Sequence, residues 1–240
     1  EGWWSFGEAW MESYAWADGL GHGGFEGWVD GSFGEGPVFG EWAREGDHPG
    51  GELHAVPERL NWFGNRGCLH DAEGRIRRFA QVNRWITCVL SFKSRRRSPL
   101  MQPGRYTELF FLDEASAYAA GHRPCAECRR ADFDHFVAHW QARYGENRVG
   151  PIDRRLQEAR MEGKARRLVP MDRDAVPVGA MIREGGADLL RAPKGWYRWS
   201  FKGYAPVDAP GPRVTLLTPE PFAALMGKGL KVEIHPSALE

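Results

Sequence analysis

The chain has 240 residues, of which 42% are hydrophobic, a proportion typical of a globular protein with one large domain or two small ones. It contains no run of about 18 apolar residues, and its acidic, glycine-rich start is unlike a secretory signal. These features exclude a membrane-spanning helix and favour a cytoplasmic protein. In a reducing compartment, the four cysteines are expected to bind metal rather than to form disulfides.

The charges are segregated along the chain, although the formal net charge is zero. Residues 1–51 carry ten acidic residues against the single base Arg44, so residues 52–240 hold 31 Lys and Arg against 22 Asp and Glu. A basic body of this kind favours a polyanionic partner, and we expect nucleic acid, DNA in particular.

Residues 1–51 differ in composition from the rest of the chain. They contain 14 of the 30 glycines and six of the 11 tryptophans, so that neither helical nor strand periodicity survives. We predict an acidic leader outside the fold, either disordered or a non-native extension of the reading frame. A mimic of nucleic acid that covers the basic residues is the alternative.

Two strands are predicted in the first half of the basic body. The apolar run at 85–92 (WITCVLSF) is typical of a buried strand, and the segment at 93–97 (KSRRR) of a basic turn. The run at 106–112 (YTELFFL) predicts a second strand.

Two helices follow these strands. Asp113 is placed to cap a short helix over 114–120, which Gly121 would end in the left-handed conformation. After Cys128 the pattern predicts an amphipathic helix to Tyr144, whose core-facing residues are Phe133, Phe136, Val137, Trp140 and Tyr144.

The remaining chain is predicted to be charged and then rich in strands. The charged residues at 153–167 indicate a solvated helix or linker. A short helix is expected over 220–226, capped by Thr218 and with Pro219 at its first position. Strands are predicted at 178–183, 196–201, 214–217 and 231–234.

The fold class predicted from these elements is α+β, with a small zinc-knuckle α/β module followed by a β-rich C-terminal region. The chain is divided into a leader at 1–51, the zinc module at 52–145, the charged helix or linker at 146–175 and the β-rich region at 176–240. Nothing in the sequence indicates an oligomeric state.

The four cysteines supply the number of thiolates that a closed tetrahedral zinc site needs. Cys125 and Cys128 lie in the stretch GHRPCAECRR, and Cys68 and Cys88 lie further upstream. We predict a Zn²⁺ site formed by all four. His70 or His122 is the alternative fourth ligand if Cys88 is a buried structural thiol, and a redox pair or no metal at all is the remaining interpretation.

The segment ELFFLDEASAYAAGHRPCAECRR resembles the second half of the metal-binding domain of the Ada DNA-repair proteins. With GNRGCLHD at 64–71, it also resembles a family of uncharacterised bacterial metal-binding proteins. The resemblance covers about residues 85–132 and implies that Cys125, Cys128 and Cys88 are zinc ligands. It departs from the Ada pattern because Cys88 lacks a close cysteine neighbour, so the resemblance implies zinc more strongly than DNA contact or methyl transfer.

Basic residues beside the cysteines are candidates for phosphate contacts, with a solubilising surface as the alternative. The predicted nucleic-acid-binding residues are Arg95, Arg96, Arg97, Arg129 and Arg130. The leading hypothesis is a zinc protein that binds DNA without sequence specificity, with zinc in a structural role. The alternatives are a metal-dependent DNA-repair or nuclease enzyme using His70, Asp71 or His235, and a structural zinc domain that serves protein contacts.

Overall fold

The computed structural model describes residues 44–93 and 99–239. Within these ranges the fold is mixed α+β, with two six-stranded sheets, one two-stranded hairpin and four α-helices. The predicted arginines Arg95, Arg96 and Arg97 lie outside the described residues, as does most of the predicted leader.

The first sheet is built from the N-terminal half of the described chain. Its strand order is β2-β1-β5-β3-β4-β6, and its neighbours pair antiparallel except for the parallel pairs β1–β5 and β4–β6. All its strands are short: β1 (Arg44–Asp47), β2 (Leu53–Val56), β3 (Trp62–Asn65), β4 (Ile86–Cys88), β5 (Leu109–Phe111) and β6 (Arg123–Pro124).

The second sheet is built from the C-terminal part and is entirely antiparallel, in the order β13-β12-β11-β10-β14-β9. Gly185 and Gly186 make the β10–β11 turn with φ of 55° and 79°, a conformation that other residues rarely adopt. Its strands are β9 (Val169–Asp172), β10 (Met181–Glu184), β11 (Ala187–Ala192), β12 (Gly195–Ser200), β13 (Gly203–Val207) and β14 (Arg213–Leu216). The separate hairpin pairs β7 (Met161–Glu162) with β8 (Ala165–Arg166).

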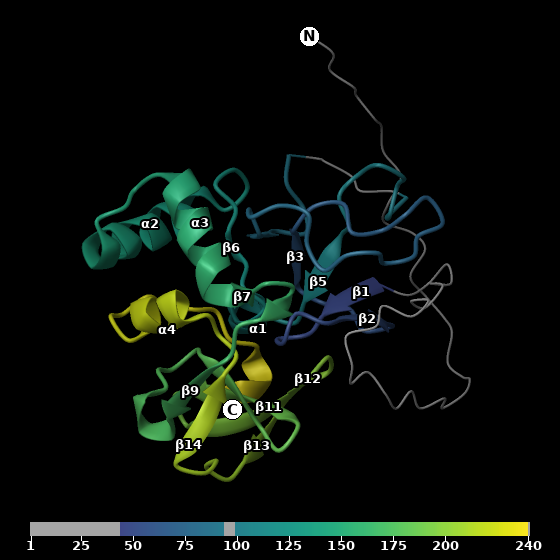
Figure 1. The fold of residues 1–240 in the computed structure, drawn as a ribbon. Helices are drawn as coiled ribbons and strands as arrows, with labels where there is room; N and C mark the ends of the chain where they lie inside the picture. The colour runs from purple at the N-terminus through teal and green to yellow at the C-terminus, as the bar shows by residue number, and fades with distance from the viewer. Residues whose placement is uncertain (1–43, 94–98, 240) are drawn as a thin grey trace.

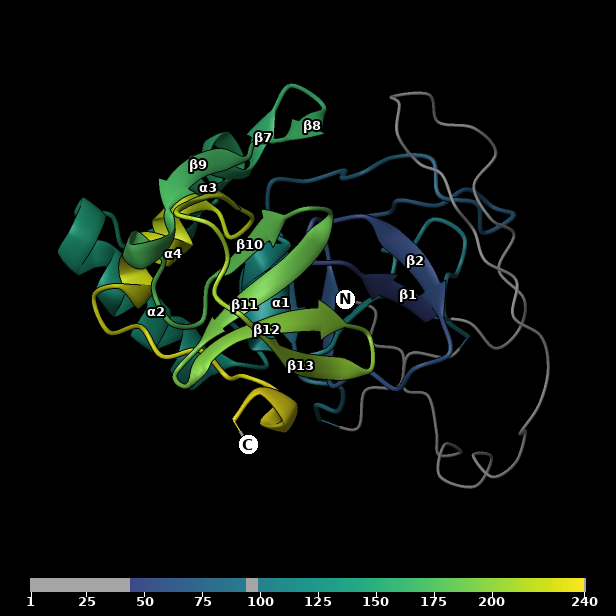
Figure 2. The same cartoon turned by 90° about the horizontal axis from the view of Figure 1, so that it is seen from below.

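Helix α1 (Glu114–Ala119) joins the two sheets into one core. All six of its residues are buried. Ala115 and Ala119 belong to a hydrophobic cluster that contains Phe110 of the first sheet and Leu190 of the second. Figure 2 shows α1 behind β10 and β11. Because one core is shared, residues 52–145 and 176–240 pack together.

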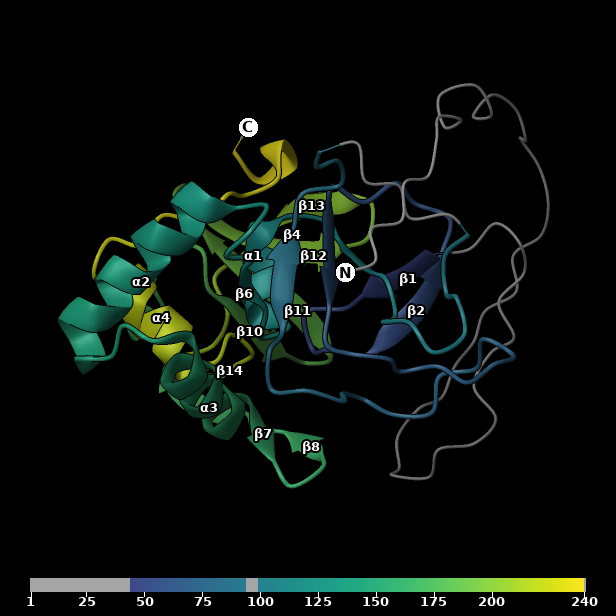
Figure 3. The ribbon, with the colours of Figure 1, turned by 90° about the horizontal axis from the view of Figure 1, so that it is seen from above.

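A second hydrophobic cluster lies between the second sheet and the three other helices. These are α2 (Arg130–Tyr144), α3 (Val149–Arg160) and α4 (Glu220–Met226), which gather on one side of the molecule in Figures 1 and 3. Their buried apolar residues against the sheet include Phe133, Phe136, Trp140, Ile152, Leu156, Phe222 and Leu225.

The N-terminus of α1 is capped by Asp113, the residue that precedes the helix, together with Ser116. The Asp113 carboxylate accepts a hydrogen bond from the Ser116 amide at 2.8 Å, and the Ser116 hydroxyl accepts one from the Asp113 amide at 3.1 Å. The second carboxylate oxygen accepts from the Tyr204 hydroxyl and the His235 amide, each at 2.9 Å. The predicted Asp113 cap is therefore confirmed.

The C-terminus of α1 is held by arginines from a distant part of the chain. Arg166 donates hydrogen bonds to the carbonyls of Ala119 at 2.6 Å and Ala120 at 2.9 Å. Arg160 donates to the carbonyl of Gly121 at 2.8 Å, where φ is 95° as the predicted helix stop requires. Positive charge at this end complements the helix dipole.

The end of the range predicted as leader belongs to the fold. Residues 44–47 form β1, and Asp47 pairs with Arg66 at 2.8 Å between Oδ2 and Nη1, with both side chains fully buried. Burial raises the pKa of Asp47 to about 6, against the lowering effect of Arg66. The fold therefore begins at or before residue 44, within the range that composition assigns to the leader.

Helix prediction succeeded at three places, from capping and stop residues for the two short helices and from the apolar stripe for the long one. The helices predicted over 114–120, from Cys128 to Tyr144, and over 220–226 are α1, α2 and α4. The charged range 153–167 contains most of α3 and then the β7–β8 hairpin, and α3 contributes three fully buried side chains, Ile152, Leu156 and Arg160.

Three details of the C-terminal prediction were wrong. The Thr218 hydroxyl does not cap α4, because it accepts the Met181 amide at 2.9 Å. Residues 231–234 form no strand. The strands β9, β11 and β13 were not predicted, since charged and proline residues interrupt their apolar pattern. Among the described residues, no helix has the length and apolar character that crossing a membrane requires.

Candidate metal centre

Three of the four cysteines are brought together by the first sheet and the start of α2. Cys88 is the last residue of β4, and Cys125 follows β6, which pairs parallel with β4. The Cys125 amide donates a hydrogen bond to the Thr87 carbonyl at 2.9 Å, which continues this pairing beyond the strands. Cys128 lies one turn later, just before α2, so the loop folds both thiols back over the end of β4.

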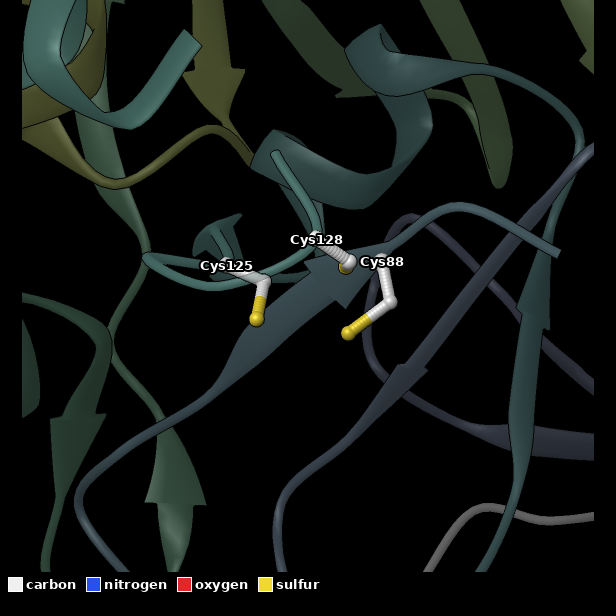
Figure 4. Close-up of side chains that lie close together, drawn as sticks. All are labelled: Cys88, Cys125 and Cys128. Atoms are coloured by element: carbon white, nitrogen blue, oxygen red, sulfur yellow. The ribbon is translucent and has the colours of Figure 1, made fainter. Parts of the chain in front are cut away.

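The three Sγ atoms lie within 4.8 Å of one another. Figure 4 shows Cys88 on its strand facing Cys125 and Cys128 on the adjoining loop. Cys88 is buried, whereas Cys125 and Cys128 are half-buried, so one side of the cluster is reachable from solvent. Thiolates around a tetrahedral zinc stand about 3.8 Å apart for a Zn–S bond of about 2.3 Å, so the observed spacing suits such an ion. The arrangement can hold a metal ion that accepts soft thiolate ligands.

The three thiols differ in pKa. A hydrogen bond from Cys88, which outweighs the effect of burial, lowers the pKa of Cys125 to about 5. The same hydrogen bond, together with burial, raises the pKa of Cys88, and burial raises that of Cys128. Because metal ions bind the thiolate form, a metal would displace the remaining protons from this cluster.

Cys68 is not part of the cluster of three. Antiparallel pairing places Phe63 opposite Cys88, so the chain beyond β3 runs away from Cys88 toward the Ile86 end of β4. Cys68 follows there, and its thiol lies 3.5 Å from the His70 carbonyl oxygen. The structure therefore brings together three of the four cysteines predicted as zinc ligands and places Cys68 apart from them.

Neither histidine considered as a substitute ligand joins the cysteines. The His70 ring lies 2.7 Å from the Thr107 hydroxyl and 3.3 Å from the Gln102 carbonyl. His122 is fully buried, with its ring centroid 4.8 Å from that of Phe111, and neither ring nitrogen has a hydrogen-bond partner among the described residues. Burial and neighbouring arginines hold the pKa of His122 well below its usual range.

The other residues proposed for catalysis are occupied elsewhere. The Asp71 carboxylate pairs with Arg75 at 3.0 Å and with Arg77 at 2.7 Å. The His235 ring lies 2.9 Å from the Ser237 hydroxyl, and its backbone amide belongs to the Asp113 network at the α1 N-terminus. None of them is a member of the cysteine cluster.

The two arginines after the cysteines differ in exposure. Arg129 is buried, and its guanidinium donates to Glu114, to Asp132 at 2.9 Å and to the Thr87 hydroxyl. Arg130 is exposed and pairs with Asp134 at 2.9 Å. Of the two, only Arg130 offers a surface for phosphate. The Arg129 partners Glu114 and Thr87 were missed by the sequence reasoning, because their contacts span 15 and 42 residues.

Comparison of the chain with protein-family models, with curated proteins and with solved structures finds no match.

Proposed function

We propose that this protein binds a zinc ion through Cys88, Cys125 and Cys128, and that the ion has a structural role. The convergence of three thiols from two separate chain segments carries the proposal. Zinc suits the donor set because thiolates favour it over oxygen-seeking cations, and Zn²⁺ has no redox chemistry to control. A fourth position on the half-buried side is left for water or for a ligand from outside the cluster.

The structural role follows from what the ion would connect. Cys88 ends a strand of only three residues, and the other two ligands precede a helix of 15 residues. A metal bound to all three would fix the start of α2 against the edge of the first sheet. Because metal binding then adds to folding free energy, removing the ion should lower the melting temperature.

The zinc proposal is tested by metal analysis of freshly purified, reduced protein. We expect about one zinc per chain, retained by Cys68→Ser and lost by Cys125→Ser. Cobalt substitution should give the intense visible absorption of a tetrahedral thiolate site in the wild type and in Cys68→Ser. If Cys68→Ser loses its zinc, the three-cysteine site is contradicted. If the wild type contains no zinc, the proposal as a whole is contradicted.

We also propose that the basic surface binds DNA without reading its sequence. In the described part of residues 52–240, five acidic residues are buried against four arginines, so burial does not reduce the positive excess left at the surface. The residues concerned are Glu108, Asp113, Glu114, Asp153 and Asp188, and Arg66, Arg123, Arg129 and Arg160. A net positive surface attracts the phosphate backbone irrespective of base sequence.

The DNA proposal is tested by fluorescence anisotropy on a short labelled duplex at two salt concentrations. The logarithm of the affinity should fall by roughly 0.9 per log unit of salt for each phosphate neutralised. Reversing Arg95, Arg96 and Arg97 to Glu should weaken binding to all sequences alike. The matched control reverses three exposed arginines of the α2–α3 region, namely Arg143, Arg148 and Arg154.

The open position on the cysteine cluster favours a second candidate, a metal-dependent DNA-repair or nuclease enzyme. Catalytic zinc sites keep one position for water, whereas structural sites are closed by four protein ligands. Metal-dependent cleavage or repair of a damaged duplex, lost in Cys125→Ser and kept in Cys68→Ser, would establish this candidate. If the protein binds no duplex under any condition, the remaining hypothesis is a zinc domain that serves protein contacts.

A further inference from the structure

Two histidines, His135 and His139, lie one turn apart on helix α2. A spacing of four residues places them on the same face of the helix. The buried residues Phe133, Phe136 and Trp140 form a different face, which packs in the core. His135 is exposed and His139 is half-buried, and α2 lies at the edge of the molecule in Figures 1 and 3. The pair is therefore reachable from solvent.

The two imidazole rings are close enough to share one metal ion. Their centroids lie 4.4 Å apart, with an angle of 66° between the ring planes. An ion of the size of Zn²⁺ lies about 2.0–2.1 Å from each ligating nitrogen, which sets the centroids of two imidazoles bound to it about 4.5–5 Å apart. The observed spacing therefore needs only a small adjustment of the side chains to admit such an ion.

The hydrogen bond of His139 leaves the correct nitrogen free for a metal. Its Nδ1 lies 3.0 Å from the His135 carbonyl oxygen, and a carbonyl can only accept, so Nδ1 carries the proton. In the neutral ring, Nε2 then has the lone pair. Metal-binding histidines usually donate their other ring N–H to a carbonyl or carboxylate in this way. The ring nitrogens of His135 have no hydrogen-bond partner in the described part of the chain, so both rings can offer a nitrogen to one ion.

The side chains around the pair leave room for an ion and its water. Asp132 and Asp134 are already paired with Arg129 and Arg130, each at 2.9 Å. Among residues 44–93 and 99–239, no third His, Cys, Asp or Glu forms a metal-binding group with the two histidines. An ion would therefore keep positions for water or for a donor from another molecule. The other neighbours on this side of α2 are exposed alanines, namely Ala131, Ala138 and Ala142.

We infer that His135 and His139 bind one divalent transition-metal ion on the outer face of α2, separately from the cysteine cluster. Two histidines at i and i+4 on a helix are the arrangement that helical zinc sites use. Imidazole suits Zn²⁺, Ni²⁺ and Cu²⁺, whereas Mg²⁺ and Ca²⁺ prefer oxygen ligands. The inference does not rest on the proposed function, since the two sites share no residue and use different donor atoms.

The inference is tested by titration calorimetry of the full chain with Ni²⁺ up to about 1 mM, after zinc has been added to the cysteine cluster and the excess removed. We expect the wild type to bind Ni²⁺ at the pair and to give no response to Mg²⁺. His135→Ala and His139→Ala should each weaken this binding at least roughly tenfold, because each removes one of the two ligands. Any Ni²⁺ that binds at the cysteines is common to all variants, so the comparison isolates the histidines.

The matched control keeps two histidines on α2 but changes their spacing, by combining His139→Ala with Gln141→His at an exposed position. Positions 135 and 141 are about 120° apart around a helix, so their rings cannot bind the same ion. This respaced variant should bind Ni²⁺ as weakly as His139→Ala. Thermal melts without Ni²⁺ verify that all variants fold, and added Ni²⁺ should raise the melting temperature of the wild type more than that of any variant.

Two results would overturn the inference. One is a wild type whose Ni²⁺ binding is absent or is weakened by neither single substitution. The other is a respaced variant that binds Ni²⁺ as tightly as the wild type, because the i, i+4 pair would then not be required. The zinc content of Cys125→Ser, which tests the proposed metal centre, is measured separately, so either proposal can fail without the other.

Discussion

The two ends of helix α1 are stabilised in the same way but from different distances in the sequence. At its N-terminus, the acidic groups are Asp113 and Glu114, which are adjacent to the helix or part of it. At its C-terminus, the basic groups are Arg160 and Arg166, whose contacts with the helix end span 39 to 47 residues. Both arrangements complement the helix dipole, yet only the first is visible in a local stretch of sequence.

The difference shows what a fully buried helix of six residues requires. Such a helix is too short to be stable alone, and at its ends it has N–H and C=O groups that water cannot reach. At the N-terminus the local Asp113 side chain accepts the Ser116 amide and, among the described residues, only the Ala115 amide donates to a distant group, the Glu233 carbonyl at 3.2 Å. At the C-terminus the carbonyls of Ala119 and Ala120 depend on the distant Arg166. We therefore expect the distant end to be the more sensitive to substitution.

The largest effect is expected from removing Arg166. Arg166→Met would leave the carbonyls of Ala119, Ala120 and Leu217 without their charged donor in a buried site. We expect a loss of roughly 3–5 kcal/mol in unfolding free energy, measured by urea denaturation. Arg167→Met is the control, because that exposed arginine makes a single 3.4 Å contact and should cost under about 0.5 kcal/mol. Equal losses would show that the α1 end does not depend on its arginine.

A pH dependence is expected from Asp47, which lies 4.0 Å from the ring of His122 beyond the same end of α1. Its pKa of about 6 in the folded state exceeds the ordinary 3.8, so the folded protein holds the proton more tightly than the unfolded chain. This contribution is full below about pH 4 and is lost as pH rises through 6, up to about 3 kcal/mol. Urea denaturation at several pH values should show the trend in the difference between the wild type and Asp47→Asn. A constant difference would contradict it.

An intermediate effect is expected at the local end of α1. Asp113→Ala removes the helix cap and leaves the Tyr204 hydroxyl and the His235 amide without their acceptor. We expect a loss of about 2 kcal/mol by thermal or urea unfolding. Asp134→Ala, which removes an exposed carboxylate from α2, should change stability by under about 0.5 kcal/mol. If Asp113→Ala lost more unfolding free energy than Arg166→Met, the N-terminal end of α1 would be the more sensitive one, contrary to our expectation.

The smallest effect is expected from His122, which follows α1 directly. Since neither of its ring nitrogens has a hydrogen-bond partner within residues 44–93 and 99–239, we expect His122→Leu to remove no hydrogen bond and to change stability by at most about 1 kcal/mol, in the stabilising direction. His70→Leu is the matched comparison, because both nitrogens of His70 have partners and its replacement should cost about 1–3 kcal/mol. A large loss for His122→Leu would reveal a partner such as a buried water.

Local sequence was sufficient where one segment determines the structure. The Asp113 cap, the stripe of Phe133, Phe136 and Trp140 on α2, and the pairing of Cys125 with Cys128 all lie within a few helical turns. The convergence of Cys88 on that pair was expected from the resemblance to the Ada-type domain and is present in the structure.

The rest depends on strand register and tertiary packing. Whether Cys68 reaches the cluster is decided by the antiparallel pairing of Phe63 with Cys88, which spacing along the chain does not encode. The strand at 44–47 was not predicted, because the sequence around it is rich in glycine. It is stabilised by pairing with β2 and β5. Thr218 precedes a helix and resembles a cap. Its hydroxyl instead accepts a hydrogen bond from the amide of Met181, 37 residues away.

The core shared by the two sheets limits how this gene can be rearranged by recombination. A module that spreads between genes needs a core of its own, because its apolar face is otherwise exposed in the new host. Cys88 packs in the same cluster as Leu190 and Tyr197 of the second sheet. A gene segment that encodes only residues 52–145 would carry the three clustered cysteines but not the residues that cover them. We therefore expect the three-cysteine cluster to keep its cover only when it is encoded together with the C-terminal sheet.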